Sequence, residues 1–307
     1  MNCNSKIYND IGIEAEYILR IDGVGKKYRG FSLENISFQI PRGTIMGLLG
    51  RNGAGKTTLI QLLLGHTKQS SGIIHIGRYN MAEDMLKAQQ QLGFVVDKPV
   101  FFKEHTIWRN ADWFGSFYPE YSPEEMSKWI KICQLDGGKR VQELSKGELV
   151  KLQFAFAMSH HCKLLILDEP TGNLDPVFRK EFLRILQETV DCCQVSVLIS
   201  THLTEDLEQI ADDITILEQG RMLYTGSMEE IKQRYQIVKG SPDAGKMLKK
   251  QKIQGILGCH VTNVGFEAMA DKAWYQPGML EQYAQEKLLW EEADLSAAMY
   301  YLTRGGK

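Results

Sequence analysis

The sequence lacks any long apolar run. No stretch approaches the roughly eighteen apolar residues that a membrane-spanning helix needs. The first residues, MNCNSKIYNDIGIEAEY, contain no apolar core of the kind that a signal peptide carries. We therefore expect the chain to stay in the cytoplasm, with residues 1–16 as a flexible tail.

Paired cysteines are also missing. The six cysteines are scattered, none forms a C-x-x-C pair, and the neighbours Cys192 and Cys193 cannot easily bridge each other. We expect buried or half-buried free thiols in a reducing compartment. The adjacent residues His160 and His161 would point about 100° apart on a helix, so we do not expect them to share a metal ion.

Neither sign of charge is in excess. The chain has 36 Lys and Arg against 38 Asp and Glu, and a net charge of −2. Such a balance provides no global field to hold nucleic acid or an acidic membrane. The hydrophobic fraction of 43% is ordinary for a globular protein. We interpret the local lysine cluster as a solvated face rather than a phosphate track; it comprises Lys246, Lys249, Lys250 and Lys252.

Strand and helix patterns alternate along most of the chain. The segments TIMGLLG, KLLILDE and VSVLIST are short apolar runs typical of buried parallel strands. YILRIDGV and ENISFQI alternate apolar and polar residues, as half-buried strands do. Helical patterns follow these segments. This alternation predicts an α/β fold with a mostly parallel sheet covered on both faces.

Two segments depart from this alternation. Residues of about 99–161 read as a helical insertion whose aromatic side chains we expect in a core rather than in a base-stacking platform. KGSPDAGKMLKKQK reads as a linker or exposed loop, and the residues after it as a small α/β unit that ends in a helix. We therefore expect a main domain over 17–233 and an accessory domain over 234–307.

A glycine-rich stretch lies between a predicted strand and a predicted helix. Residues 50–57 read GRNGAGKT and match G-x-x-x-x-G-K-[ST]. Glycines let backbone N–H groups turn toward an oxyanion, and the following helix adds its positive dipole end. The motif leaves kinases, GTPases and ATPases open. It predicts a nucleotide phosphate site with a catalytic lysine and an Mg²⁺-binding hydroxyl, formed by Asn52, Gly53, Ala54, Gly55, Lys56, Thr57 and Thr58.

Two carboxylates follow a buried strand. The run LLILDE ends in Asp168 and Glu169. Acidic residues at the end of a parallel strand project from the sheet edge where ligands bind in α/β folds. We expect Asp168 to bind Mg²⁺, directly or through water, and Glu169 to orient and deprotonate a water aimed at the γ-phosphate.

With these motifs, residues 17–230 resemble the nucleotide-binding subunit of an ATP-binding cassette (ABC) transporter. LSKGE, residues 144–148, stands where that family carries its LSGGQ signature, and a GNLD loop and a histidine after VSVLIST follow in family order. The resemblance implies a P-loop ABC ATPase fold with an antiparallel β subdomain, a helical subdomain and a small C-terminal α/β extension. It also implies ATP with Mg²⁺ as cofactors.

The resemblance assigns further roles. Tyr28 takes the place of the aromatic residue that stacks on adenine, and His202 that of the switch histidine at the γ-phosphate. In the family two such domains pack head to tail, so Ser145 and the N–H of Gly147 would contact ATP bound by the partner chain. The chain would therefore act as a homodimer, or as a heterodimer with a related ATPase.

Three positions depart from the family pattern. Lys146 and Glu148 replace a glycine and a glutamine of the signature. We expect these replacements to be tolerated because the position points away from ATP. The alternative is that the lysine lies near ATP and strengthens anion binding. Asp97 falls where the family has the glutamine that contacts Mg²⁺ and the attacking water. We expect Asp97 to remain a metal-side sensor; the alternative is a turn residue before Lys98 and Pro99.

The C-terminal sequence ADLSAAMYYLTR loosely resembles the tail of bacterial exporter ATPases of the bacitracin, lantibiotic and multidrug type. We expect a subunit that drives a separate transmembrane permease, and the transporter they form would export an antimicrobial peptide, drug or lipid-like substrate. Through the permease, the subunit would lie on the inner face of the cell membrane. We do not expect it to contact nucleic acid. The alternatives are an ABC ATPase that acts on ribosomes or nucleic acid, and a silent regulatory cassette.

Overall fold

The computed structural model describes residues 16–172, 174–251, 253–274 and 278–304. These residues form two compact units. The first unit runs to residue 203 and includes 217–222, and the second unit comprises 204–216 and the chain from 223 onward. The predicted boundary between a main domain and an accessory domain after residue 233 stays a prediction. The predicted flexible tail, residues 1–16, lies outside the described residues except for Glu16. Within the described ranges, no helix is long and apolar enough to cross a membrane.

A parallel sheet positions the site in the first unit. Four of its strands lie wholly in this unit, in the order β3-β8-β7-β6, and each pairs in parallel with its neighbour. Every residue of β3 and β8 is buried, which explains their unbroken apolar runs. Because the strands are parallel, β3, β7 and β8 end at one edge. Their bounds are β3 Ile45–Gly50, β6 Leu92–Val95, β7 Leu164–Asp168 and β8 Ser196–Thr201.

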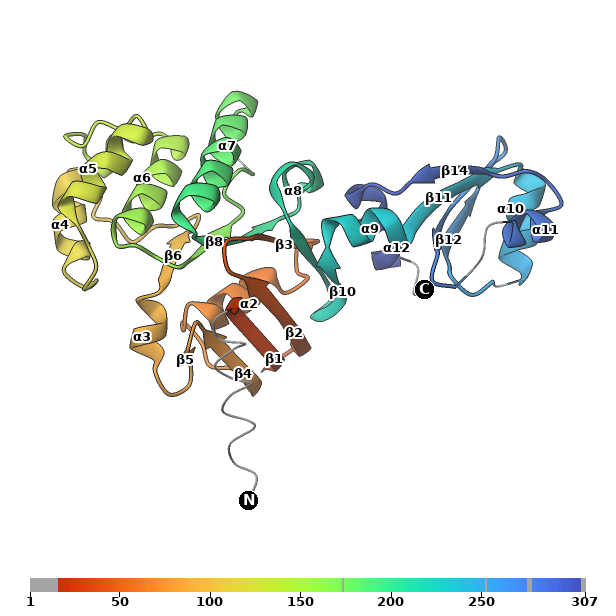
Figure 1. Cartoon of the computed structure of the whole chain (residues 1–307), viewed down its shortest axis with the longest axis horizontal. Helices are drawn as coiled ribbons and strands as arrows, with labels where there is room; N and C mark the ends of the chain where they lie inside the picture. Colours follow the sequence, from red (N-terminus) through yellow and green to blue (C-terminus); the bar gives the residue numbers. More distant parts are fainter. Residues whose placement is uncertain (1–15, 173, 252, 275–277, 305–307) are drawn as a thin grey trace, which may run out of the picture. The chain divides into compact units, whose positions relative to one another are not determined.

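The predicted antiparallel subdomain is present in the same unit. Its sheet has the order β2-β1-β4-β5 with antiparallel pairing throughout (Figure 1). Leu59 and Leu63 of α2 join a core with Ile21 and Ile74 of this sheet. These elements are β1 Tyr17–Tyr28, β2 Phe31–Pro41, α2 Lys56–Leu63, β4 Ser71–Ile76, β5 Tyr79–Asn80 and α3 Met85–Gln89.

Helices fill the expected insertion, but most of its aromatic residues are not in a core. Trp129 is 4% exposed, whereas Trp113 is 43% and Phe117 is 72% exposed. The prediction was wrong for the latter two. Trp113 lies on α4, which buries Ile107 and Ala111 instead, and Phe117 follows the end of that helix. Helical spacing alone does not decide which stripe of a short helix faces inward. The helices are α4 Ile107–Gly115, α5 Pro123–Ile132, the 3₁₀ turn η1 Val141–Glu143, α6 Lys146–Ser159 and α7 Pro176–Cys193.

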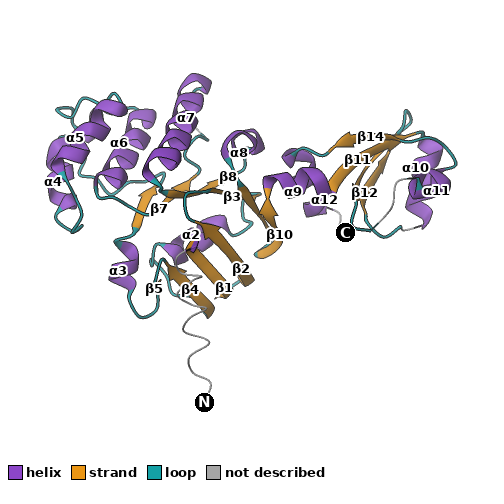
Figure 2. Ribbon diagram, in the orientation of Figure 1, coloured by secondary structure: helices purple, strands orange, loops and turns teal. Residues whose placement is uncertain are grey.

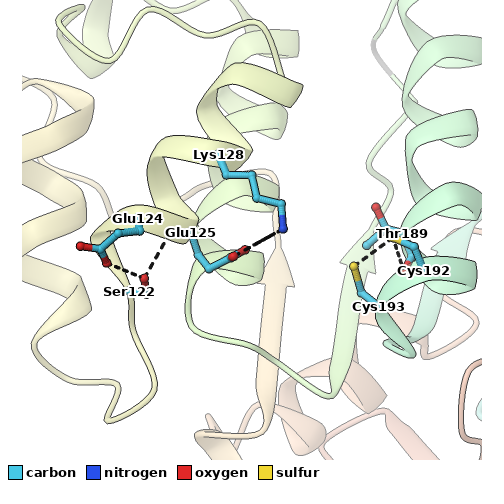
Figure 3. A network of polar contacts seen from close by, with 7 residues as sticks. All are labelled: Ser122, Glu124, Glu125, Lys128, Thr189, Cys192 and Cys193. Carbon is cyan, nitrogen blue, oxygen red and sulfur yellow. Dashed lines mark hydrogen bonds and ion pairs between the residues drawn. The ribbon is translucent and has the colours of Figure 1, made fainter.

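Local polar contacts define the start of α5 and the end of α7, as Figure 3 shows. The Ser122 hydroxyl accepts a hydrogen bond from the N–H of Glu125 at 3.2 Å, so it caps α5. The sulfur atoms of Cys192 and Cys193 lie 3.0 Å apart in the last turn of α7. Both residues are exposed, so the expectation of buried or half-buried thiols was wrong for this pair.

The second unit contains the small α/β structure predicted from the C-terminal sequence. Its antiparallel sheet has the order β12-β13-β11-β14 (Figure 2). The helices α10 and α11 bury Leu248 and Leu280 in a core with Phe266 of β13. Its elements are α8 Thr204–Ile210, α9 Met228–Arg234, β11 Tyr235–Gly240, α10 Pro242–Gln251, β12 Ile256–Val261, β13 Phe266–Asp271, α11 Met279–Ala284, β14 Leu289–Glu292 and α12 Leu295–Arg304. Two more strands, β9 Asp213–Glu218 and β10 Arg221–Ser227, are divided between the units.

The segment expected to be a linker forms a strand end and a helix up to Gln251. Residues 235–240 form β11, and Pro242–Gln251 form α10. The Ser241 hydroxyl accepts from the N–H of Ala244 at 3.2 Å, and proline is favoured at the first helical position. Ala244 and Leu248 are buried four residues apart. The high lysine content concealed this narrow apolar stripe.

Candidate functional site

The phosphate loop joins β3 to α2 at the edge where the parallel strands end. Gly55 has φ +112° and directly precedes α2. A Cβ at this position would lie 2.7 Å from the Leu33 side chain, so both the backbone conformation and the available space require glycine. The first N–H groups of α2 have no intrahelical acceptor and can therefore bind an anion.

Lys56, Glu169 and His202 are connected side chain to side chain. The Lys56 Nζ donates to the Gly50 carbonyl at 2.6 Å and lies 3.4 Å from Glu169 Oε1. The other oxygen of that carboxylate lies 2.8 Å from His202 Nδ1. The lysine and histidine therefore hold Glu169 from two sides. The structure brings together all three residues that the sequence predicted to be catalytic.

The backbone of Glu169 fixes where this carboxylate points. Its φ is +49°, a left-handed conformation that is rare for a residue with a side chain. The conformation costs about 1 kcal/mol or more. The N–H of Glu169 donates to the Ser200 carbonyl at 2.8 Å, which ties the strained residue to β8. Strain held in place by the sheet is typical of functional positions.

Asp168 lies half-buried at the end of β7. Burial raises the pKa of its carboxyl group and the charge of Glu169 adds to this effect, while Lys56 and the hydroxyls of Ser200 and Thr57 oppose it. Within the described part of the chain, Asp168 Oδ1 is buried and accepts no hydrogen bond. An unpartnered carboxylate oxygen beside the Thr57 hydroxyl is a fitting environment for a hard divalent cation. The donor set therefore fits Mg²⁺.

The other predicted nucleotide contacts vary in exposure. Asn52, Gly53 and Thr57 are exposed, Thr58 is half-buried and Ala54 is buried. Tyr28 is 45% exposed at the end of β1, with the Lys26 ammonium group 5.2 Å from its ring centroid. Its predicted role against adenine stays a prediction.

The LSKGE stretch forms the N-terminus of α6. Ser145 is exposed, and its hydroxyl accepts from the N–H of Glu148 at 3.2 Å. In return, Glu148 Oε2 accepts from the N–H of Ser145 at 2.9 Å, which completes a capping box. The Ser145 N–H and Lys139 hold the pKa of Glu148 below its ordinary value. The glutamate that replaces the family's glutamine thus stabilises the start of this helix.

Gly147 lies against an aromatic ring of α7. A Cβ there would be 3.0 Å from Phe178 Cε2. The ring has little freedom to move, because it stacks on Phe182 with centroids 6.4 Å apart and lies 4.8 Å below the Lys151 ammonium group. The close approach of α6 and α7 therefore requires a residue without a side chain.

We expect Gly147→Val to lower the free energy of unfolding by about 1–3 kcal/mol, because the added side chain must displace the Phe178 ring. Chemical denaturation of the purified protein measures this loss. Phe178→Leu in the same chain makes room and should recover part of it. A variant as stable as the wild type would show that the two helices do not pack this closely.

A cavity of about 220 Å³ lies beside the two carboxylates. Asp97 and Lys146, both of which depart from the family pattern, line it together. Asp168 and Glu169 lie on its wall as well, and Gln153 of α6 contributes a further polar group. Asp97 is exposed and lies two residues after the end of β6. Its role on the metal side of the site stays a prediction.

Sequence reasoning missed two residues that shape the site. Phe178 was not predicted to contribute to the site. Gln153 is 4% exposed and was not noticed, although a lone amide in the otherwise apolar run LQFAFAM is a recognisable signal. A buried polar side chain requires a hydrogen-bond partner, so such a residue indicates a specific contact.

Comparison with known proteins agrees with this geometry. The family model described as ABC transporter matches residues 33–172. The ABC transporter ATP-binding protein YdbJ of Bacillus subtilis, itself uncharacterized, is 35% identical over 211 residues, which cover 68% of each chain. The bacitracin transport ATP-binding protein BcrA of Bacillus licheniformis is 32% identical over 205 residues, 66% of this chain and 67% of the relative.

Solved structures give the same assignment. An ATP-binding subunit of an ABC transporter superposes with a TM-score of 0.65 at 26% identity, covering 70% of this chain and 92% of the other. CbiO1 of Clostridium perfringens, part of the ABC transporter complex cbiONQ, has a TM-score of 0.63 at 26% identity, covering 70% of this chain and 90% of the other. The chain belongs to the ABC transporter ATP-binding proteins, and it is an ATP-binding subunit with the ATPase site of that family.

Proposed function

We propose that this ATPase powers a separate transmembrane permease through ATP-driven head-to-tail dimerisation and that the assembly exports an antimicrobial peptide, a drug or a lipid-like substrate. The observation that carries the proposal is the contact of Glu169 with both Lys56 and His202 at the sheet edge beside the phosphate loop. This arrangement supplies a base, a phosphate-binding cation and a sensor for the γ-phosphate.

Each side chain has a distinct task in hydrolysis. Lys56 binds the β- and γ-phosphates, and as it does so its contact with Glu169 is exchanged for a contact with ATP. Glu169 then accepts a proton from the attacking water, and His202 holds the carboxylate in place through the 2.8 Å contact. Tyr28 stacks on adenine. Asn52, Gly53, Ala54, Gly55 and Thr58 form the remaining phosphate contacts.

Thr57 and Asp168 would hold Mg²⁺, with Asp97 on the same side of the site. When bound there, Mg²⁺ would offset the negative charge that develops during phosphoryl transfer. Asp168 Oδ1 is available for this role because it accepts no hydrogen bond from the described residues. A cation there also relieves the cost of burying the charged carboxylate, which the raised pKa of Asp168 reflects.

The signature half of the site serves the second chain of a dimer. Ser145 is exposed at the N-terminus of a 14-residue helix, where the helix dipole favours an anion. In a head-to-tail pair, Ser145 and the N–H of Gly147 would contact the γ-phosphate bound by the partner. ATP then joins the two chains, and hydrolysis separates them. The partner is a second copy or a related ATPase.

The names of two relatives support the proposed permease partner and the proposed class of substrate. ABC transporter ATP-binding proteins generally work with transmembrane permease subunits, and two relatives are named for bacitracin transport. Binding to such a permease would hold the chain on the inner face of the cell membrane. The balanced charge of the chain gives no support to the alternative, action on ribosomes or nucleic acid.

Capture of the permease tests this function. The tagged Glu169→Gln protein, loaded with ATP, is incubated with detergent-solubilised native membranes, and bound proteins are identified by mass spectrometry. We expect one polytopic membrane protein at stoichiometric level, and Lys56→Ala, which lacks the phosphate-binding lysine, serves as the control. Recovery of ribosomal proteins or nucleic acid without a membrane protein would overturn the proposal.

A further inference from the structure

The amide of Gln153 holds the backbone of one residue at both ends. Its Oε1 accepts from the N–H of Val96 at 2.9 Å, and its Nε2 donates to the carbonyl of the same residue at 3.1 Å. Gln153 is only 4% exposed. A buried amide with both ends bonded to a single peptide residue is a stiff link, because neither bond is easily exchanged for water.

Val96 is the point where the sheet releases the chain. The parallel pairing of β6 with β7 ends at Val95, opposite Leu167. The amide of Gln153 therefore takes over from the sheet one residue later. Asp97 comes next and lines the 220 Å³ cavity with Asp168 and Glu169. The position of Asp97 relative to these carboxylates thus depends on the residue that Gln153 holds.

The same helix carries both Gln153 and the signature. Ser145 caps α6, and Gln153 lies eight residues further along it, about 12 Å along the helix axis. An α-helix of this length moves as a rigid element. A displacement of Ser145 and Gly147 against a partner's nucleotide would therefore move the Gln153 amide together with the Val96 backbone to which it is bonded.

We propose that Gln153 is a positioning residue that couples the signature end of α6 to the Asp97 loop, so that docking of the signature on one ATP adjusts the metal side of the chain's own site. The coupling rests on the proposed ATP site and dimer. The competing explanation is purely structural: Gln153 only satisfies two buried backbone groups of Val96. The two explanations differ in what the loss of the amide does to turnover.

Steady-state ATP hydrolysis of the full-length protein separates them. Gln153→Met keeps the volume and removes both hydrogen bonds to Val96, together with a longer one from Nε2 to the Leu149 carbonyl at 3.5 Å. We expect kcat to fall about tenfold while KM for ATP stays within twofold, because the loop that adjusts the reacting geometry is released but the phosphate loop is intact. Asp97→Ala should lower kcat as well, and the double variant should be no slower than the slower single variant.

A conservative variant provides a second readout. In Gln153→Glu, the neutral carboxyl group can accept from the Val96 N–H and donate to its carbonyl, as the amide does, whereas the carboxylate faces the carbonyl unfavourably. Activity relative to the wild type should therefore rise as the pH falls.

Thr189→Val is the matched control for Gln153→Met. It also removes a buried hydrogen bond, from Thr189 Oγ1 to the Ile185 carbonyl at 2.7 Å, but this bond lies on α7, away from the loop.

The outcomes separate this inference from the proposed function. If Asp97→Ala slows turnover but Gln153→Met slows it no more than Thr189→Val does, the coupling is wrong and the ATP site stands. Additive effects of Asp97→Ala and Gln153→Met overturn the coupling as well. If Asp97→Ala has no effect, both the metal-side role of Asp97 and the coupling fail, whereas the ATP-bound dimer of Glu169→Gln is judged by its own experiment.

Discussion

Replacing Glu169 by Gln is expected to lower ATP turnover by about two to three orders of magnitude while ATP binding is retained. The amide keeps the shape of the side chain and can still contact His202, but it cannot accept a proton from water. ATP then stays bound between the two halves of the site. The variant should therefore elute as a dimer in size-exclusion chromatography with light scattering when ATP and Mg²⁺ are present, and as a monomer without them.

Glu120→Gln is the matched control, because Glu120 is an exposed glutamate that precedes α5 and makes the same change in charge. It should hydrolyse ATP at the wild-type rate. A Glu169→Gln variant that remains fully active and monomeric would contradict both the base role of Glu169 and the ATP-bound dimer. Loss of turnover without dimerisation would leave the base role intact and contradict only the dimer.

The parts of the site that lie close together in the sequence could be predicted from it. The strand, the glycine turn and the helix of residues 45–63 follow directly along the chain, and local rules for apolar runs and glycine apply to them. Asp168 and Glu169 come at the end of a strand whose apolar run is unmistakable. Because parallel strands end at one edge of a sheet, these separate motifs converge without any further information.

Contacts between distant segments could not be predicted in the same way. Gln153 bonds Val96 across 57 positions in the sequence, and no local pattern pairs an amide with a particular backbone residue. Gly147 packs on Phe178 only because α6 and α7 approach each other closely. The register of two packed helices depends on the whole interface. The glycine itself was visible in the sequence, but the ring that requires it was not.

The helix α10 illustrates a different difficulty. Lysines and turn-forming residues dominate the segment KGSPDAGKMLKKQK, so composition favours a loop. The buried residues of α10 are Ala244, Gly245 and Leu248, and this is a narrow stripe. Its partner, Phe266 of β13, comes later in the chain. Tertiary packing therefore stabilises a helix that its own residues only weakly indicate.

Mixing two inactive variants is expected to restore ATP hydrolysis if the chains pair head to tail. Lys56→Ala removes the phosphate-binding lysine, and Ser145→Arg places a bulky cation where the signature meets the partner's nucleotide. Each homodimer then has two defective sites. In the mixed dimer, one site combines both lesions, whereas the other combines the intact phosphate loop of one chain with the intact signature of the other.

Random pairing at equal concentrations makes about half of the dimers mixed, and one of the two sites in each mixed dimer is complete. If the sites act independently, the mixture should therefore recover roughly a quarter of wild-type turnover. Mixing Lys56→Ala with Glu169→Gln is the control. Both of these lesions lie on the phosphate-loop side, so every site in that mixed dimer stays defective and no activity should return. Recovery in both mixtures, or in neither, would contradict head-to-tail pairing of two copies. Recovery in the first mixture alone would place Ser145 in the active site of the other chain.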